Sequence, residues 1–121
     1  MLDHIGVPVS DLIVSRAFYT RALAQLAAGV VMESNDAVGF GKAGKPHFWI
    51  GASIMPLSPV HIAFTADRAE VDAFYAAAMS AGGCDNGPPG LRPHYHPSYY
   101  AAFVLDPDGH NVEAVCHAPQ N

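Results

Sequence analysis

The chain contains two copies of one sequence pattern, and this duplication constrains the fold more than any other feature. The first copy reads LDHIGVPVSDLIVSRAFYTRAL and the second reads PVHIAFTADRAEVDAFYAAAM. The offset between the copies is 57 residues at His4 and His61 and 56 residues at Phe18 and Phe74. A nearly constant offset indicates a duplicated supersecondary unit. A pseudo-twofold relation between the units would bring the two histidines to one shared place.

Each copy begins a segment whose pattern predicts a strand, a helix and three further strands. The first segment is expected to hold a strand at 2–9, a helix from Ser10 or Asp11 to about Leu26, and strands near 30–33, 37–42 and 47–52. The second is expected to hold a strand at 60–65, a helix capped by Asp67 with Glu70 as its capping-box partner, a loop at 85–97 with little strand, and strands at 99–105 and 111–116.

Length, charge and cysteine content restrict the class of protein. Half of the 121 residues are apolar, which suits one domain with a modest core. The net charge of −5, without a Lys/Arg cluster, argues against nucleic acid and acidic membrane surfaces as partners. No apolar run reaches the roughly 18 residues of a membrane span, and no basic segment of a signal peptide precedes the first strand. Cys84 and Cys116 lack C-x-x-C spacing, so we expect free thiols in a cytoplasmic protein.

Side-chain alternation along the strands predicts a metal site. If the apolar rows of the strands pack under the helices, His4, His61 and Glu113 all point to the opposite face. Their neighbours on that face, Gly6 and Ala63, are small and leave a hollow. Two imidazoles and one carboxylate at a hollow form a facial triad with open positions for water or substrate. The alternative is that the histidines are structural and that ligands bind without metal.

The motifs DHIGV, SRAFY, HIAF and DPDGHNVEAV resemble the vicinal-oxygen-chelate superfamily, which includes glyoxalase I, extradiol dioxygenases and bleomycin-binding proteins. The resemblance covers essentially the whole chain. It implies a single α+β domain, 1–121, in which two βαβββ units, 1–56 and 57–121, form a curled mixed sheet around a cavity. It also implies that His4, His61 and Glu113 hold a divalent ion such as Zn, Ni, Mn or Fe, with Glu113 also acting in catalysis.

Departures from glyoxalase I argue against a standard glutathione-dependent enzyme. Glyoxalase I carries a further carboxylate ligand on the fourth strand of its first unit, where this chain has HFWIG. Either Trp49 or His47 takes that position; Trp49 cannot bind a metal, whereas His47 is a possible ligand or base. The first strand also lacks the arginine that glyoxalase I uses for the glutathione carboxylate, because it reads Gly-Val-Pro-Val at 6–9.

The loop at 90–97 is a second candidate for chemistry. Arg92 could pair with a substrate carboxylate or phosphate, and His94 and His96 could act as acid or base near pH 7. The alternative is that this Pro-rich loop packs at a dimer surface. His110, which follows the glycine of a tight turn, is expected at the surface.

These observations favour a metal-dependent enzyme, of lyase, isomerase or dioxygenase type, that binds two oxygens of a small metabolite. The alternative function is a metal-free, bleomycin-resistance-like protein that sequesters a drug or metabolite. In either case Trp49, Arg92 and Tyr100 are expected to contact the ligand. A planar ligand could stack on the aromatic rings of Phe48, Trp49, Tyr99 and Tyr100. We expect a homodimer, because uncovered sheet edges and an apolar cavity rim need a partner, and the partner could complete the site.

Overall fold

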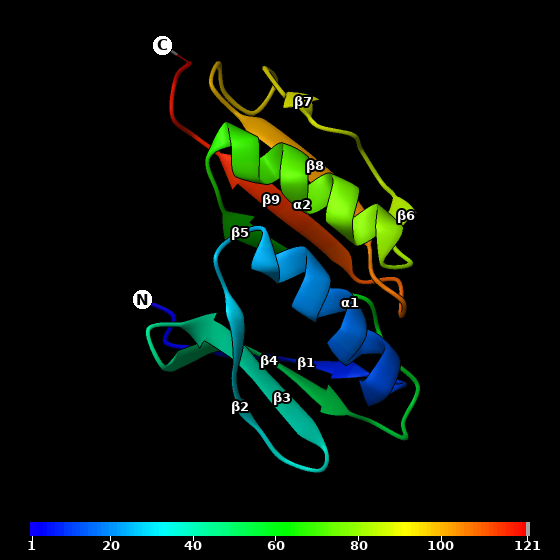
Figure 1. Ribbon diagram of the computed structural model, residues 1–121. Helices are drawn as coiled ribbons and strands as arrows, with labels where there is room; N and C mark the ends of the chain where they lie inside the picture. Colours follow the sequence, from blue (N-terminus) through cyan, green and yellow to red (C-terminus); the bar gives the residue numbers. More distant parts are fainter. Residues whose placement is uncertain (121) are drawn as a thin grey trace.

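The computed structural model describes residues 1–120, in which the strand–helix–strands order occurs twice (Figure 1). The first unit consists of β1 (Ile5–Val9), α1 (Leu12–Ala24), β2 (Gly29–Glu33), β3 (Ala37–Lys42) and β4 (Lys45–Ala52). The second consists of β5 (His61–Thr65), α2 (Arg68–Ser80), the two-residue strands β6 (Cys84–Asp85) and β7 (Gly90–Leu91), β8 (Tyr100–Leu105) and β9 (Asn111–Cys116). The predicted α+β fold class is confirmed.

The strands form two hydrogen-bonded sheets, one in each unit. The first sheet has the order β1-β4-β3-β2, and the second has the order β5-β9-β8-β6, with β7 also paired to β8. In both sheets the opening strand pairs in parallel with the last strand of its unit, and the remaining pairs are antiparallel. The two units therefore share one topology, as a duplication requires.

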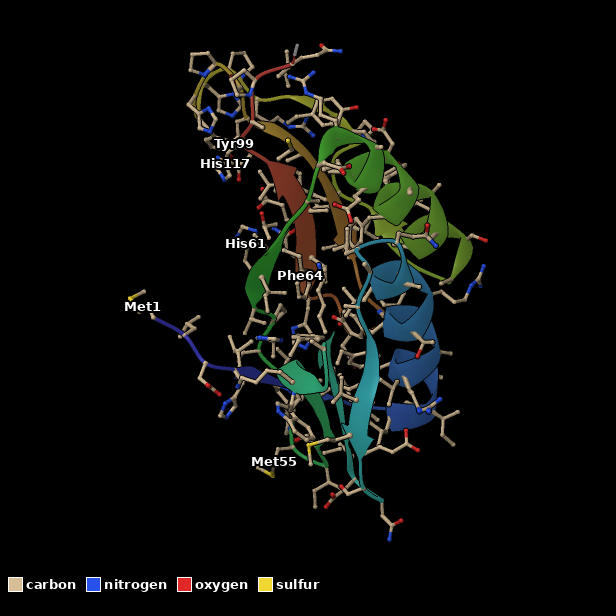
Figure 2. All side chains as sticks on the ribbon, turned by 60° about the vertical axis from the view of Figure 1, so that its left-hand side comes forward. Met1, Met55, His61, Phe64, Tyr99 and His117 are labelled. Carbon is tan, nitrogen blue, oxygen red and sulfur yellow. The ribbon has the colours of Figure 1, made fainter. Side chains whose placement is uncertain are left out.

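Both helices lie on the same side of the strands, and the other face of the sheets is left open (Figure 2). α2 packs on β8 and β9, and α1 packs on β4 and against α2. Val71 and Phe74, on one face of α2, are fully buried. The β9 residues Val112 and Ala114 are also buried in this core. Because side chains alternate along a strand, Glu113 between them points to the face without helices.

The tight turn before β9 differs from the sequence-based expectation, because His110 is fully buried there. Its Nε2 atom donates a hydrogen bond to the carbonyl oxygen of Pro8 (2.8 Å), and its Nδ1 atom accepts one from the N–H of Val60 (3.1 Å). The buried carboxylate of Asp106 accepts hydrogen bonds from the Tyr19 hydroxyl (2.5 Å) and the His110 backbone N–H (2.9 Å). The predicted surface position of His110 is therefore wrong, since this turn connects the two units.

Both cysteines are free thiols, as predicted: Cys84 is exposed and Cys116 is buried. No helix within residues 1–120 has the length and apolar character that crossing a membrane requires.

The predicted capping box at the start of α2 is confirmed, and its removal should destabilise the protein. The Asp67 side chain accepts a hydrogen bond from the Glu70 N–H (2.8 Å), and the Glu70 side chain accepts one from the Asp67 N–H (3.0 Å). Asp67→Ala should lower the free energy of unfolding by about 1 kcal/mol, measured by urea denaturation. Glu70→Gln retains an acceptor oxygen and should cost much less; equal losses would contradict the capping role.

Candidate functional site

The open face of the second sheet brings His61 and Glu113 together. His61 begins β5, and Glu113 lies in the middle of the adjacent strand β9, opposite Ala63. The His61 Nε2 atom lies 2.8 Å from the Glu113 Oε1 atom. The His61 side chain is 53% exposed, whereas the Glu113 side chain is only 1% exposed. The imidazole is thus accessible from solvent, and the carboxylate beneath it is held inside the protein.

The second oxygen of Glu113 has its own partner, the hydroxyl of Tyr99. The Tyr99 hydroxyl donates a hydrogen bond to Glu113 Oε2. Partial burial, together with this hydrogen bond to a carboxylate, raises the pKa of Tyr99 to about 12. The phenol therefore keeps its proton at neutral pH. A buried carboxylate requires such partners, because burying an unpaired charge is costly, and these two contacts fix the Glu113 side chain from both sides.

A cavity of about 390 Å³ opens beside this pair. It is lined by His61, Tyr95, His96, Tyr99, Phe103 and Glu113. The Tyr95 and Tyr99 rings meet with centroids 4.9 Å apart, and the His96 Nε2 atom lies 2.6 Å from the Nδ1 atom of His117. In Figure 2, Tyr99 and His117 lie together above His61 on the open side. The cavity is thus lined by the aromatic rings of Tyr95, Tyr99 and Phe103 and by the ionisable side chains of His61, His96 and Glu113.

His4 lies in the first unit, just before β1, and does not join the other two residues of the predicted triad. Its Nδ1 atom donates a hydrogen bond to Asp3 Oδ1 (2.7 Å), which also accepts from Lys45 Nζ (2.7 Å). The bond to Lys45, followed by that to His4, lowers the pKa of the Asp3 carboxyl to about 2. A carboxylate on Nδ1 leaves the Nε2 atom of His4 available as a ligand, which is a common arrangement for metal-binding histidines.

One chain therefore assembles only part of the predicted metal site. His4 and His61 line one groove of about 380 Å³ between the units, together with His47. Within residues 1–120, however, no three His, Cys, Asp or Glu side chains converge on a point where they could hold a metal ion. The structure brings His61 and Glu113 into contact and leaves His4 apart from them.

The predicted ligand-contacting residues have different surroundings. Trp49 lines a cavity that also contains His4. Arg92 lies in a cavity next to that of His61, but its guanidinium donates to the carbonyl oxygens of Gly90 and Pro88 (2.8 Å each). These bonds fold the side chain onto its own loop and use two of its five N–H donors, so three are left for a ligand.

Tyr100 is not in a cavity of the open face. Its hydroxyl donates to Asp72 on α2 (2.6 Å), and the Arg68 guanidinium lies 4.7 Å from its ring centroid. The alternation along the strand places Tyr99, rather than Tyr100, on the open side. Of the two tyrosines expected to contact a ligand, Tyr99 therefore lines the cavity beside His61 and Tyr100 does not.

Comparison with known proteins gives the family. The model of the Glyoxalase/Bleomycin resistance protein/Dioxygenase superfamily matches residues 1–114, and the chain belongs to this superfamily. A crystal structure of a glyoxalase/bleomycin resistance protein from Albidiferax ferrireducens T118 is 30% identical and has a TM-score of 0.82, covering 97% of this chain and 98% of that chain. No curated protein matches the chain in sequence.

Two more distant structures share the fold. A glyoxalase/bleomycin resistance protein/dioxygenase family enzyme from Burkholderia phytofirmans PsJN is 20% identical, with a TM-score of 0.74 over 97% of this chain and 98% of that chain. The oxidase ChaP-H2 is 19% identical, with a TM-score of 0.69 over 100% of this chain and 95% of that chain. At this level of identity, the likeness concerns the fold alone.

Sequence reasoning missed the contact of Asp3 with His4 and the contact of Tyr99 with Glu113. Asp3 precedes His4 directly in the chain, so a carboxylate–histidine pair could have been proposed from the dipeptide alone. Tyr99 lies just outside β8, and its contact with Glu113 spans 14 residues. This contact depends on the register in which β8 and β9 pair, which side-chain alternation alone does not specify.

Proposed function

We propose that this protein is a metal-dependent enzyme of its superfamily that binds a small oxygenated metabolite at a divalent ion held by His61, Glu113 and a copy of His4. The contact between His61 Nε2 and Glu113 Oε1, 2.8 Å long, carries the proposal. Neighbouring ligand atoms about 2.0–2.2 Å from one ion lie roughly 3 Å apart when they subtend a right angle. The pair therefore needs little rearrangement to bind an ion, and imidazole with carboxylate suits Zn, Ni, Mn or Fe.

The third ligand in this proposal is His4 of the partner subunit in a homodimer. His4 is exposed, its Nδ1 atom is bound to Asp3, and it lies apart from the His61 and Glu113 of its own chain. The face of the sheets opposite the helices is uncovered (Figure 2), and uncovered faces and edges favour association. Two chains meeting through these faces would place the first unit of one against the second unit of the other.

Each residue near the site has a distinct role in this proposal. The bound ion would supply Lewis-acid polarisation of substrate oxygens. Glu113 would accept or return a proton, and Tyr99 would hold its Oε2 atom so that Oε1 remains beside His61. The aromatic side chains of Tyr95 and Phe103 would enclose the apolar part of the substrate and exclude water. Arg92 would contribute positive electrostatic potential near the cavity, although some of its N–H donors are already bonded to its own loop.

The composition of the cavity argues against glutathione-dependent glyoxalase activity. An anionic tripeptide conjugate requires several cationic groups, and the residues lining the cavity beside His61 include no lysine or arginine. The neighbouring Arg92 already donates to two backbone carbonyls. We therefore expect a smaller substrate with at most one anionic group.

The test measures metal content after loading with each candidate ion and gel filtration. The wild-type protein should retain about one ion per chain, and Glu113→Gln or His61→Ala should reduce retention by at least tenfold, because each removes a ligand. His94→Ala, which changes another histidine outside the ligand set, should retain the ion. A screen of dicarbonyl, catechol and epoxide substrates would then identify the reaction.

Two outcomes would contradict the metal proposal. The first is wild-type protein that retains none of the four ions. The second is retention that is unchanged in Glu113→Gln while circular dichroism shows native folding. The first result would show that the protein binds none of these ions. The second would show that an ion binds elsewhere than at the His61–Glu113 pair.

The second candidate function is metal-free binding of a planar drug or metabolite. It is favoured by one observation: both oxygens of Glu113 already have partners within the chain, His61 and Tyr99. A carboxylate satisfied in this way needs no ion. Under this alternative, aromatic ligands should still bind to chelator-treated protein and quench its tyrosine fluorescence. Added metal should not change the affinity of the protein for these ligands.

A further inference from the structure

A further cavity, separate from those described above, lies on the other side of the aromatic pair Phe48 and Phe64. Its volume is about 280 Å³, and it is formed by the end of α1, strands β3 and β4, and the end of β5. Phe48 and Phe64 meet edge to face with centroids 5.3 Å apart, and both rings also line the groove that contains His4 and His61. Neither His61 nor Glu113 lines this cavity, so its ligand would be distinct from the substrate proposed above.

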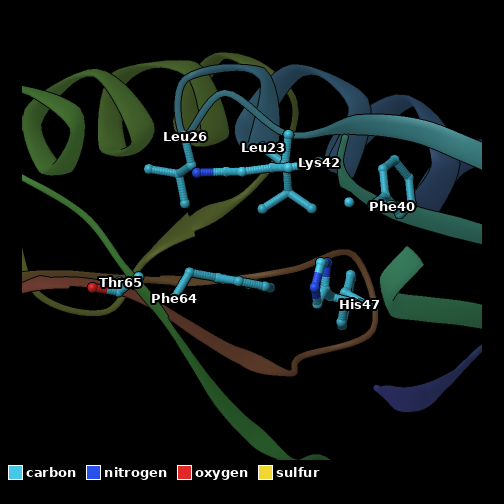
Figure 3. A pocket seen from close by; sticks show the side chains of 10 residues that line it. Leu23, Leu26, Phe40, Lys42, His47, Phe64 and Thr65 are labelled. Atoms are coloured by element: carbon cyan, nitrogen blue, oxygen red, sulfur yellow. The ribbon is translucent and has the colours of Figure 1, made fainter. Parts of the chain in front are cut away.

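The walls of this cavity are mostly apolar, and its polar side chains are Lys42, His47 and Thr65. Its apolar lining includes Leu23, Leu26, Phe40, Phe48 and Phe64. In Figure 3, Lys42 runs along the same edge as Leu23 and Leu26, and His47 lies on the opposite edge with Phe64. A space with apolar walls binds hydrocarbon in proportion to the area removed from water.

Lys42 gives this cavity a charge preference. It is exposed, and no carboxylate within residues 1–120 lies within 4.0 Å of its ammonium group. The neighbouring Lys45 on the same hairpin differs, because it is paired with Asp3 at 2.7 Å. The cavity therefore combines an apolar interior with one unpaired cation, and with an imidazole that can donate a further hydrogen bond.

We propose that this cavity binds an aliphatic monocarboxylate of medium chain length. The hydrocarbon chain would lie against the leucine and phenylalanine side chains, and the carboxylate would accept hydrogen bonds from Lys42 Nζ. One ammonium group matches one negative charge, whereas a phosphate dianion would need more donors. The volume, about 280 Å³, lies just below the usual range for ligand cavities, roughly 300–1,000 Å³, which favours a short, flexible chain over a fused ring system.

The test is calorimetric titration of the full-length protein with hexanoate, octanoate and the neutral octanamide. Octanoate should bind more tightly than hexanoate, by about fourfold for each methylene that the cavity buries. Octanamide should bind at least about fivefold more weakly than octanoate, because it lacks the charge-assisted hydrogen bond. Amide NMR shifts should change at Ala28 and Gly41, which line the cavity.

Variants separate this site from other surfaces. Lys42→Met should remove the preference for octanoate over octanamide, whereas the matched control Lys45→Met should retain it. Ala28→Phe, which fills the cavity from a partly exposed position, should abolish binding of both ligands. If that variant does not fold, the comparison of octanoate with octanamide on wild-type protein still decides the charge preference.

The proposal is overturned if octanoate does not bind, if octanamide binds equally well, or if Lys45→Met and Lys42→Met have the same effect. Shift changes confined to His4 and His61 would place the ligand in the groove that these two residues line, and would also overturn the proposal. Shift changes at Ala28 and Gly41 that depend on protein concentration alone would assign this cavity to a contact between two copies of the chain. If Glu113→Gln loses metal retention but still binds octanoate, the octanoate proposal stands independently of the metal site.

Discussion

Co-expression of the His4→Ala and His61→Ala variants should restore the metal binding that each variant lacks alone. If His4 of one subunit completes the His61–Glu113 pair of the other, a mixed dimer has one intact site: the chain carrying His4→Ala keeps its His61 and Glu113, and the other chain supplies His4. If all three ligands come from one chain, the mixed dimer has no intact site. Metal analysis of a heterodimer purified through two different tags should therefore give about half of the wild-type content.

A second co-expressed pair provides the control for this experiment. A dimer of His61→Ala and Glu113→Gln chains has a damaged pair in each subunit, so it should remain without metal under either arrangement. Restoration in this control would show that residues other than the His61–Glu113 pair bind the ion. Absence of restoration in the first pair, with native dimers present, would contradict a shared site, and a monomer at micromolar concentration would contradict the assembly on which it depends.

The repeat made the fold predictable, because local patterns and long-range symmetry agree. The Asp67–Glu70 capping box and the span of β9 could be predicted from the sequence, since both depend on residues close together in the chain. The α+β class followed from the order of these elements. Strand pairing into two separate sheets did not follow, because alternation defines the faces of a strand and not its neighbours.

The candidate site was only partly predictable for the same reason. Alternation placed His61 and Glu113 on one face, and the structure brings their side chains into contact. It also placed His4 there, but β1 begins only at Ile5, so His4 lies outside the regular strand and its direction is set by Asp3. Tyr100 differs from the prediction for a similar reason. It is the first residue of β8, and the face to which a residue at the start of a strand points depends on the loop before that strand.

His110→Leu should lower the free energy of unfolding by about 2–3 kcal/mol. The imidazole is fully buried and satisfies the N–H of Val60 and the carbonyl oxygen of Pro8. Leucine fills a similar volume but leaves both backbone groups without their partner, and each partly buried orphan costs roughly 1–3 kcal/mol. Pro8 lies in the first unit and Val60 precedes β5 in the second. The substitution therefore removes hydrogen bonds that hold the two units together.

The measurement is urea denaturation followed by circular dichroism, with His94→Leu as the matched control. His94 is exposed, so the control should change the free energy of unfolding by less than about 0.5 kcal/mol. A His110→Leu protein within that same margin would show that water replaces the lost hydrogen bonds at no cost. A lower dependence of the unfolding free energy on urea in the variant, with a separate early transition, would instead show that His110 couples the unfolding of the two units.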